Sequence, residues 1–318
     1  MFLDVPENVL GSFAIGVFST STLLAKAHET FKPIKSVNMA CLPPSSPLQH
    51  NSALHLGLRT GFCGSLTTFA SWILQMVKMM MGGSVSAVGT EWVAALWGIY
   101  VNVALSLISL VIGQHLAIFL SNFYQKREKH LSEASGSEDQ HKKDPAAHMN
   151  KGGQNWLIDL FMLAVLLTLT GASLAYAITD GESSESPYSP RSMWFSILLG
   201  PTGCIARWVL SLHMNAGLFE SQWFYWGTWT ANISACIIDF TCASLLVRVP
   251  LTSLQSSLLN SIITGISGSL STVSTWVVEL QTLGLKSGSG EAYIYGLSSI
   301  VTAVSLGIII YGSAVLTM

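Results

Sequence analysis

Charged residues are scarce in this chain. Lysine, arginine, aspartate and glutamate together make up 10% of its 318 residues, whereas soluble domains typically contain about 25%. Half of the residues are apolar, and the formal net charge of −2 gives no basis for binding nucleic acid. A soluble enzyme needs polar surface that this composition does not supply. The sequence therefore predicts a membrane protein that is neither an enzyme nor a nucleic-acid-binding protein.

Cysteines are also few, and their spacing fits none of the common metal and redox motifs. The five cysteines form no Cys-x-x-Cys pair and have no metal-site spacing with histidine. Most of them lie in apolar stretches, where cysteine usually packs as a small hydrophobic residue. Gly288-Ser289-Gly290 lacks the lysine of a phosphate-binding loop. We expect no disulfide, no cysteine-ligated metal and no nucleotide cofactor.

Long apolar runs are what the chain does contain. Runs of about 20 to 30 residues can cross a bilayer as helices, some of them tilted. The one long polar stretch, residues 122–155, is interpreted as a solvated cytosolic linker, with a partner-binding segment as the alternative. The eight predicted spans are 2–25, 52–80, 92–121, 156–178, 192–212, 223–247, 254–280 and 292–316.

Basic residues assign the sides of the membrane. Lys26, Lys32 and Lys35 follow the first predicted span, and six lysines and arginines follow the third span within the linker. The positive-inside rule places both loops in the cytosol. A single span, 156–178, then separates the two halves of the chain. Because one single span separates the halves, the second half enters the membrane from the opposite side and is inverted relative to the first.

A thirteen-residue motif occurs twice in the chain. Residues 60–72 read TGFCGSLTTFASW, and residues 264–276 read TGISGSLSTVSTW. Both copies lie inside long apolar segments, although glycine and hydroxyl residues are poorly suited to a regular span. Interrupted helices at membrane depth usually build an ion or substrate site. The motif therefore indicates a duplicated transport protein with one broken helix in each half.

These observations predict an all-α membrane protein made of two inverted-topology helical-bundle repeats. Repeat one covers residues 1–121, the polar cytosolic linker 122–155, the linking transmembrane helix 156–178, and repeat two 191–318. The second repeat shows four helices and the first shows three, so we expect that the first helix of repeat one is missing. Because both inverted halves lie in one chain, we also expect a monomer.

The motifs resemble those of the fluoride channel family, called Fluc or CrcB in bacteria and FEX in eukaryotes. Residues 61–72 resemble its third helix, residues 8–16 its second, and residues 200–208 its first. The tandem arrangement resembles that of the eukaryotic exporters. The resemblance implies a passive, fluoride-selective channel that exports the fluoride ion from the cytosol across the plasma membrane. A coupled small-solute transporter and a truncated, non-conducting form remain alternatives.

Aromatic rings of the repeated motif are implied pore residues in this family. The resemblance assigns Phe69, Trp72 and Trp276 to the pore, and places Val273 at the position that matches Phe69. Each pore of the family takes one ring from each repeat, so Phe69 pairs with Trp276 and Val273 with Trp72. We expect one competent pore on the Phe69 side and one vestigial pore on the Val273 side. The alternative is that these rings are core aromatics at helical spacing.

Polar residues at membrane depth are the other implied pore residues. Asn8 and Asn232 are candidate amide donors to the anion, with helix–helix hydrogen bonding as the alternative. The last helix of each repeat carries a candidate polar track, whose hydroxyls can instead bond back to their own helix. The two tracks comprise Tyr100, Asn102, Ser106 and Ser109, and Tyr295, Ser298, Ser299 and Thr302.

The broken helices have a second implied role. In the family, backbone carbonyls at the break hold a structural sodium ion, and the matching residues are Gly64, Thr67, Gly268 and Ser271. A close crossing of helices through glycine and serine is the alternative. Arg207 and Glu279 match family positions that support the pore or its vestibule, although Arg207 can also extend to the membrane interface. No other cofactor is expected.

Overall fold

The computed structural model describes residues 3–27, 39–43, 45–81, 90–134, 156–179, 189–215, 223–286 and 289–317. All regular secondary structure in these ranges is helical, which confirms the predicted all-α class. Residues 135–155 of the predicted linker lie outside the described residues. Its first part, residues 122–134, continues a helix that begins at Thr90. This stretch contains good helix formers and no glycine or proline, so nothing in it ends the helix.

Four helical segments make up the first repeat. Helix α1 spans Val5–Ala27, and α5 spans Thr90–Ala134. Between them the chain forms the short helix η1, Pro47–His50, and then a helix in four pieces. Those pieces are α2 (Ser52–Leu56), η2 (Gly57–Cys63), α3 (Gly64–Leu66) and α4 (Ala70–Met81).

The second repeat follows the same plan after helix α6, Trp156–Thr179. Helix α7 spans Pro190–Met214 and α8 spans Trp226–Arg248. The second broken helix then consists of α9 (Ser253–Ser261), η5 (Ile262–Ser267), α10 (Gly268–Leu270) and α11 (Ser274–Lys286). The last helix consists of α12 (Ser289–Gly307), η6 (Ile308–Gly312) and α13 (Ser313–Leu316).

Five described segments are long and apolar enough to cross a membrane. They match the third, fifth, sixth, seventh and eighth predicted spans, and Leu163–Thr179 is a shorter apolar helix within the fourth. The first predicted span forms α1, and the second forms the broken helix from α2 to α4. Eight crossings therefore stay a prediction. The five segments are Glu91–Leu131, Pro190–Met214, Trp226–Arg248, Ser253–Lys286 and Gly290–Leu316.

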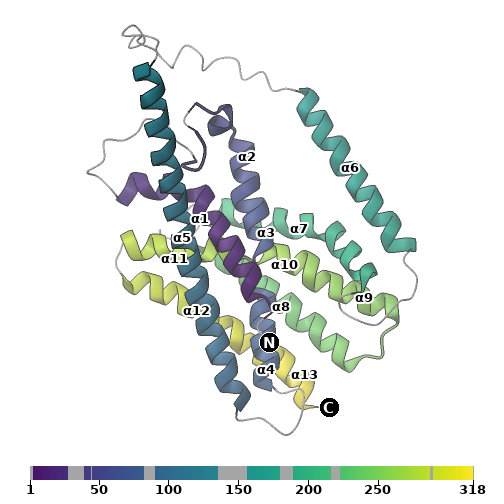
Figure 1. Ribbon diagram of the computed structural model, residues 1–318. Helices are drawn as coiled ribbons and strands as arrows, with labels where there is room; N and C mark the ends of the chain where they lie inside the picture. The colour runs from purple at the N-terminus through teal and green to yellow at the C-terminus, as the bar shows by residue number, and fades with distance from the viewer. Residues whose placement is uncertain are drawn as a thin grey trace.

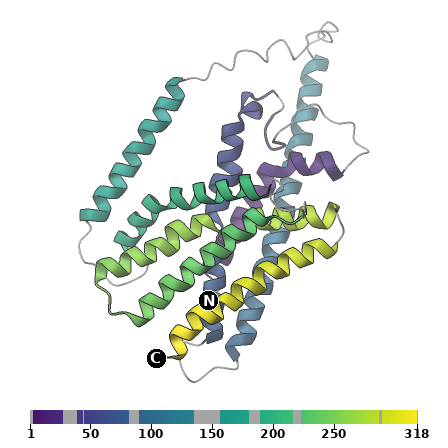
Figure 2. The same ribbon diagram turned by 180° about the vertical axis from the view of Figure 1, so that it is seen from behind.

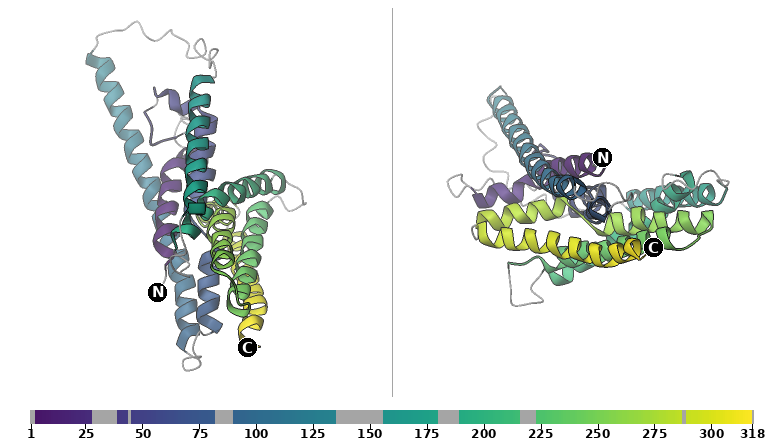
Figure 3. Two further views of the ribbon diagram at one scale, coloured as in Figure 1. Left: turned by 90° about the vertical axis from the view of Figure 1, so that its right-hand side faces the viewer. Right: turned by 90° about the horizontal axis from the view of Figure 1, so that it is seen from below.

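The helices of the two repeats cross one another. In Figure 1 the helices of the first repeat run up the page, whereas α8, α11 and α12 lie across them. Figure 2 shows the same crossing from behind, and both views of Figure 3 show the long α5 at an angle to the second repeat. The short helices α3 and α10, which precede the two breaks, contact each other. The duplicated motifs therefore meet at the crossing.

Two groups of three helices form around this crossing. Helices α1 and α5 of the first repeat pack with α11 of the second, and we call this group the first triad. Helices α8 and α12 of the second repeat pack with α4 of the first, which gives the second triad. Each triad thus takes two helices from one repeat and the helix after the break from the other. This exchange is what an internal duplication with a two-fold relation produces.

Candidate functional site

Each broken helix contains three non-helical residues, 67–69 in the first repeat and 271–273 in the second, and we place the break at the first of the three, which is extended. Helix α3 ends at Leu66, and Thr67 has φ −107° and ψ 139°. Helix α10 ends at Leu270, and Ser271 has φ −84° and ψ 160°. The helices α4 and α11 that follow need acceptors for their first backbone amides.

Each break supplies those acceptors to the other repeat. The Thr67 hydroxyl oxygen accepts hydrogen bonds from the amides of Val273 (3.2 Å) and Ser274 (3.1 Å) at the start of α11. The Ser271 hydroxyl oxygen accepts from the amides of Phe69 and Ala70, both at 3.2 Å, at the start of α4. A side-chain cap normally comes from the helix's own N-cap residue. Here the caps are exchanged, so the duplicated motifs build one shared junction.

Asparagine side chains hold the residue after each break. Asn8 Oδ1 accepts from the Thr68 amide at 2.9 Å, and Asn8 Nδ2 donates to the Thr68 carbonyl at 3.2 Å. Asn232 makes the same two bonds to Thr272, at 2.8 and 3.2 Å. Both asparagines are fully buried. The side-chain amides of Asn8 and Asn232 therefore form hydrogen bonds within the protein, to the backbone of Thr68 and Thr272. Hydrogen bonding within the protein was the alternative to donation to the anion.

These bonds take amide donors away from the helices before the breaks. In a regular helix the amide of residue i+4 donates to the carbonyl of residue i. Thr68 and Thr272 donate to the asparagines instead, while the amides of Ser71 and Thr275 donate to the hydroxyls of Thr68 (3.2 Å) and Thr272 (3.3 Å). Four carbonyls thus lose their regular helical donors: those of Gly64, Thr67, Gly268 and Ser271.

Three buried rings lie beside the junction. The centroid of Phe69 is 5.5 Å from that of Trp276 in the other repeat and 5.4 Å from that of Trp72, both in edge-on geometry. Trp276 Nε1 donates to the Ser299 hydroxyl at 3.3 Å. Val273 is buried as well but supplies no ring. The structure therefore brings Phe69 and Trp276 together, as the resemblance implied.

Unpaired polar atoms line the interface between α1 and α5. Asn102 Oδ1 accepts from Asn8 Nδ2 at 3.3 Å, which puts these two residues at one level. Ser12 lies one turn beyond Asn8, and Ser106 lies one turn beyond Asn102. Ser12 Oγ, Asn102 Nδ2 and Ser106 Oγ are buried and have no hydrogen-bond partner among the described residues. We call Ser12, Asn102 and Ser106 the donor column.

The comparison with known families follows the same division into repeats. A family model described as CrcB-like protein, Camphor Resistance (CrcB), matches residues 4–114 and 194–312. The chain belongs to the CrcB-like family. Each matched region lies inside one predicted repeat and contains one of the two breaks.

Several relatives within this CrcB-like family are named for fluoride. Fluoride export protein 1 of Neurospora crassa is 28% identical over 84% of this chain and 49% of its own length, so the chain spans about half of that relative. Fluoride export protein 1 of Schizosaccharomyces pombe is 26% identical over 83% of the chain and 77% of its own length. The fluoride-specific ion channel FluC of Escherichia coli O1:K1 is 35% identical over 36% of the chain and 83% of its own length. No solved structure matches the chain.

Arg207 is buried at the crossing in this CrcB-like protein. Its side chain is 2% exposed, so it does not extend to the membrane interface. Nε donates to the Ser269 carbonyl at 2.9 Å, and Nη2 donates to the Thr60 carbonyl at 2.8 Å. A Cβ atom on Gly64 would overlap the guanidinium group. Arg207 of α7 therefore joins the segments before both breaks, and its guanidinium group lies against Gly64.

Glu279 is a buried carboxylate with two donors. The Thr228 hydroxyl donates to it at 2.6 Å, and the Tyr295 hydroxyl donates at 2.7 Å. Tyr295, one of the residues of the predicted second track, is therefore a partner of Glu279.

The remaining track residues divide between the interior and the surface. Ser109 and Ser299 are buried. Ser109 donates across to the Val9 carbonyl of α1 at 2.7 Å, and Ser299 donates back to the Tyr295 carbonyl of its own helix at 2.8 Å. Thr302 is half-buried. Tyr100 is 62% exposed and packs on Trp97, so its prediction as a track residue was wrong.

Ser12 was missed as a site residue, although it lies within the run that resembles the second helix. The signal was its spacing of four residues from Asn8, which places both on one helix face. Its unpaired state depends on the packing of α5 and could not be read from the chain.

Proposed function

We propose that this chain conducts fluoride passively out of the cytosol through the first triad. The observation that carries the proposal is the donor column of Ser12, Asn102 and Ser106. Leaving a buried donor unpaired costs about 1–3 kcal/mol, so three of them at one interface need an explanation. A small anion that accepts hydrogen bonds from hydroxyl and amide groups supplies the missing partner.

The chemistry of the column suits a small, strongly hydrated anion. Hydroxyl and amide donors can replace water around fluoride without adding a fixed charge. The edges of Phe69 and Trp276 carry the positive part of the ring quadrupole and add a weaker attraction. The relatives named as fluoride exporters and as a fluoride-specific channel support this choice of anion.

The second triad lacks the hydroxyl and amide donors of the column, which supports a single conducting pathway. Its unpaired buried donors among the described residues are the indole Nε1 atoms of Trp72 and Trp229. Counted from the matched asparagines, Cys236 stands where the first repeat has Ser12, and Phe240 stands where it has Gly16. Both Cys236 and Phe240 are fully buried, and Phe240 packs close to Gly307. Asp239 adds a buried acid on the same helix, and an acid repels an anion. The pathway on the Val273 side is therefore proposed to be vestigial.

We also propose that a sodium ion stabilises the junction. The four carbonyls without regular helical donors are the oxygen ligands that a hard cation prefers. They come equally from both repeats, so a bound ion would neutralise their dipoles and hold the repeats together. We expect the unfolding temperature of the purified protein to be higher in sodium chloride than in N-methylglucamine chloride at equal ionic strength. Equal unfolding temperatures would contradict the sodium site.

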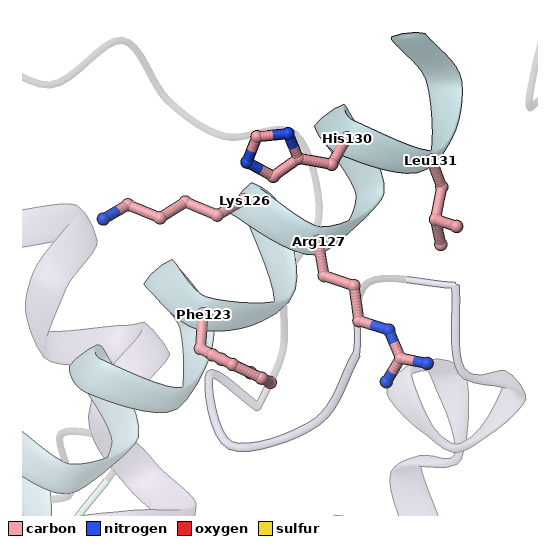
Figure 4. Close-up of a pocket in the computed structure, with 5 residues that line it drawn as sticks. All are labelled: Phe123, Lys126, Arg127, His130 and Leu131. Carbon is pink, nitrogen blue, oxygen red and sulfur yellow. The ribbon is translucent and has the colours of Figure 1, made fainter. Parts of the chain in front are cut away.

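The orientation of the pathway is proposed from the basic end of α5. Figure 4 shows Lys126 and His130 on one side of this helix, and Phe123, Arg127 and Leu131 on the other. These residues lie beyond the apolar stretch, and cytosolic segments that flank spans are rich in lysine and arginine. The basic end of α5 is thus assigned to the cytosol. Fluoride export from the cytosol places the chain in the plasma membrane, and the presence of both repeats in one chain supports a monomer. The relatives named as an exporter and a channel support a protein that is not an enzyme.

The decisive experiment measures fluoride flux from liposomes that contain the purified chain. A fluoride gradient alone should drive rapid efflux, because a passive channel needs no coupled ion. Phe69→Ile should abolish the flux, whereas Val273→Ile, the matched control on the other side, should leave it unchanged. Flux that requires a second ion gradient would favour a coupled transporter. The absence of flux from the unmodified chain would overturn the proposed function.

A further inference from the structure

Two glutamine side chains form a closed pair between the repeats. Gln114 of α5 donates from Nε2 to Oε1 of Gln281 of α11 at 2.6 Å. Gln281 Nε2 donates back to Gln114 Oε1 at 3.0 Å. Both side chains are half-buried. Each amide group has two N–H donors, and the pair uses one from each.

The position of the pair follows from the packing of the first triad. Gln114 lies two turns beyond Ser106 on α5, and Gln281 lies five residues beyond Trp276 on α11. Helix α11 contacts both α1 and α5, so it forms the third wall beside the donor column. The pair therefore bridges two walls of the triad on the side of the column that leads to the basic end of α5.

Helices α1 and α5 are in backbone contact at the level of Gln114. A Cβ atom on Gly113 would overlap the Phe13 carbonyl, and one on Gly16 would overlap the Leu110 carbonyl. Helices α1 and α5 thus touch through their backbones next to Gln114, and no ion can pass between them there. An anion that travels between the column and this end of α5 has to pass the α11 side, where the glutamines meet.

We propose that Gln114 and Gln281 form an amide gate that binds fluoride at this end of the donor column. The gate rests on the proposed fluoride conduction and adds two specificity-determining residues to it. An arriving anion accepts hydrogen bonds from the two amides and replaces the bonds that they make to each other. The exchange needs little energy, because hydrogen bonds to an ion are stronger than those between neutral amides.

The second triad offers no such gate. At the spacing that relates the repeated motifs, Val77 of α4 matches Gln281. Val77 is fully buried, and a Cβ atom on Gly307 would overlap its methyl group. An apolar contact thus stands where the first triad has the amide pair. The gate is therefore specific to the pathway that carries the unpaired donors.

The test uses methionine, which is close to glutamine in size but has no N–H donor. Gln114→Met and Gln281→Met should each lower the fluoride flux from liposomes about tenfold and raise the half-saturating fluoride concentration. The double variant should conduct less than either single variant, because it removes both amide donors to the anion. Gln125→Met is the matched control, since Gln125 lies on the same helix and its side-chain amide donates, within the part of the chain that the structure describes, to Ser121 of that helix.

The possible results separate the gate from the proposed function. Unchanged flux and unchanged half-saturation in both single variants, with conduction by the unmodified chain, would overturn the gate alone. Equal losses in Gln125→Met would also overturn it, because the effect would then be unspecific. If the unmodified chain passes no fluoride, the proposed function fails and the gate fails with it. Unfolding temperatures of all variants show whether a loss of flux reflects a loss of folded protein.

Discussion

The two triads share one junction but differ in what lines their walls. At the junction the repeats are equivalent: Asn8 and Asn232 hold the residues after the breaks, and hydroxyls cap the helices of the opposite repeat. Away from it the first triad has Ser12 and Gly16 where the second has Cys236 and Phe240, and the unpaired donors of the second triad are indole groups rather than hydroxyl or amide groups. Because both repeats make these bonds, the break serves to join the repeats and does not distinguish the two triads. In the proposed function, the side chains one and two turns away from each asparagine determine which triad can accept an anion.

The largest expected effect comes from the matched asparagines. Asn8→Leu should lower fluoride flux at least about 100-fold, because it removes the bonds to Thr68 and the bond to Asn102 of the column. Asn232→Leu removes only the bonds to Thr272, so we expect a loss of about tenfold. Liposome flux normalised to folded protein measures both. Equal losses would mean that the column contributes nothing beyond the junction.

A second effect separates function from stability in the donor column. Ser12→Ala and Ser106→Ala should each lower the flux about tenfold, since each removes one hydrogen-bond donor to the anion. Each should also leave stability unchanged or raise it by up to about 1–3 kcal/mol, because an unsatisfied buried group disappears. Flux assays and denaturant unfolding in detergent give the two readouts.

Cys236→Ala is the control for this prediction in the second triad. It should change neither flux nor stability strongly, because Cys236 occupies the place of Ser12 in the pathway that we propose to be vestigial. A column variant that loses stability and keeps its flux would show that the serines are ordinary core residues.

The shared junction should respond alike in both repeats. Thr67→Val and Ser271→Ala each remove the cap of a helix in the other repeat, and a lost cap costs about 0.5–2 kcal/mol. The free energy of unfolding should fall by similar amounts in the two variants, while Thr67→Ser should retain most of the stability. A loss confined to one variant would show that the junction is not equivalent in the two repeats.

The sequence predicted the duplication and the helical class, because these follow from motif identity and apolar length, and the resemblance to the fluoride channel family implied the meeting of Phe69 with Trp276. It did not predict that α5 would continue to Ala134. The polar composition of residues 122–134 is typical of a linker, but the same residues are also compatible with a solvated helix. The unpaired state of Ser12 and Ser106, the exchanged caps and the glutamine pair depend on which helices touch. Contacts between residues about 200 positions apart are not encoded in any local pattern.

The smallest effect tests whether the second triad can be reopened. In the Phe69→Ile background, Val273→Phe restores a ring, Phe240→Gly removes a buried side chain close to Gly307, and Asp239→Asn removes the acid. The donors that the first triad supplies through Ser12 would still be absent, since Cys236 remains. One missing hydrogen bond to an ion lowers the rate about tenfold or more, so we expect recovery of at most about a tenth of the original flux. Cys236→Ser should raise that flux further, because it returns the hydroxyl at the position that matches Ser12. Full recovery without Cys236→Ser would show that rings and space, rather than donors, decide which triad conducts.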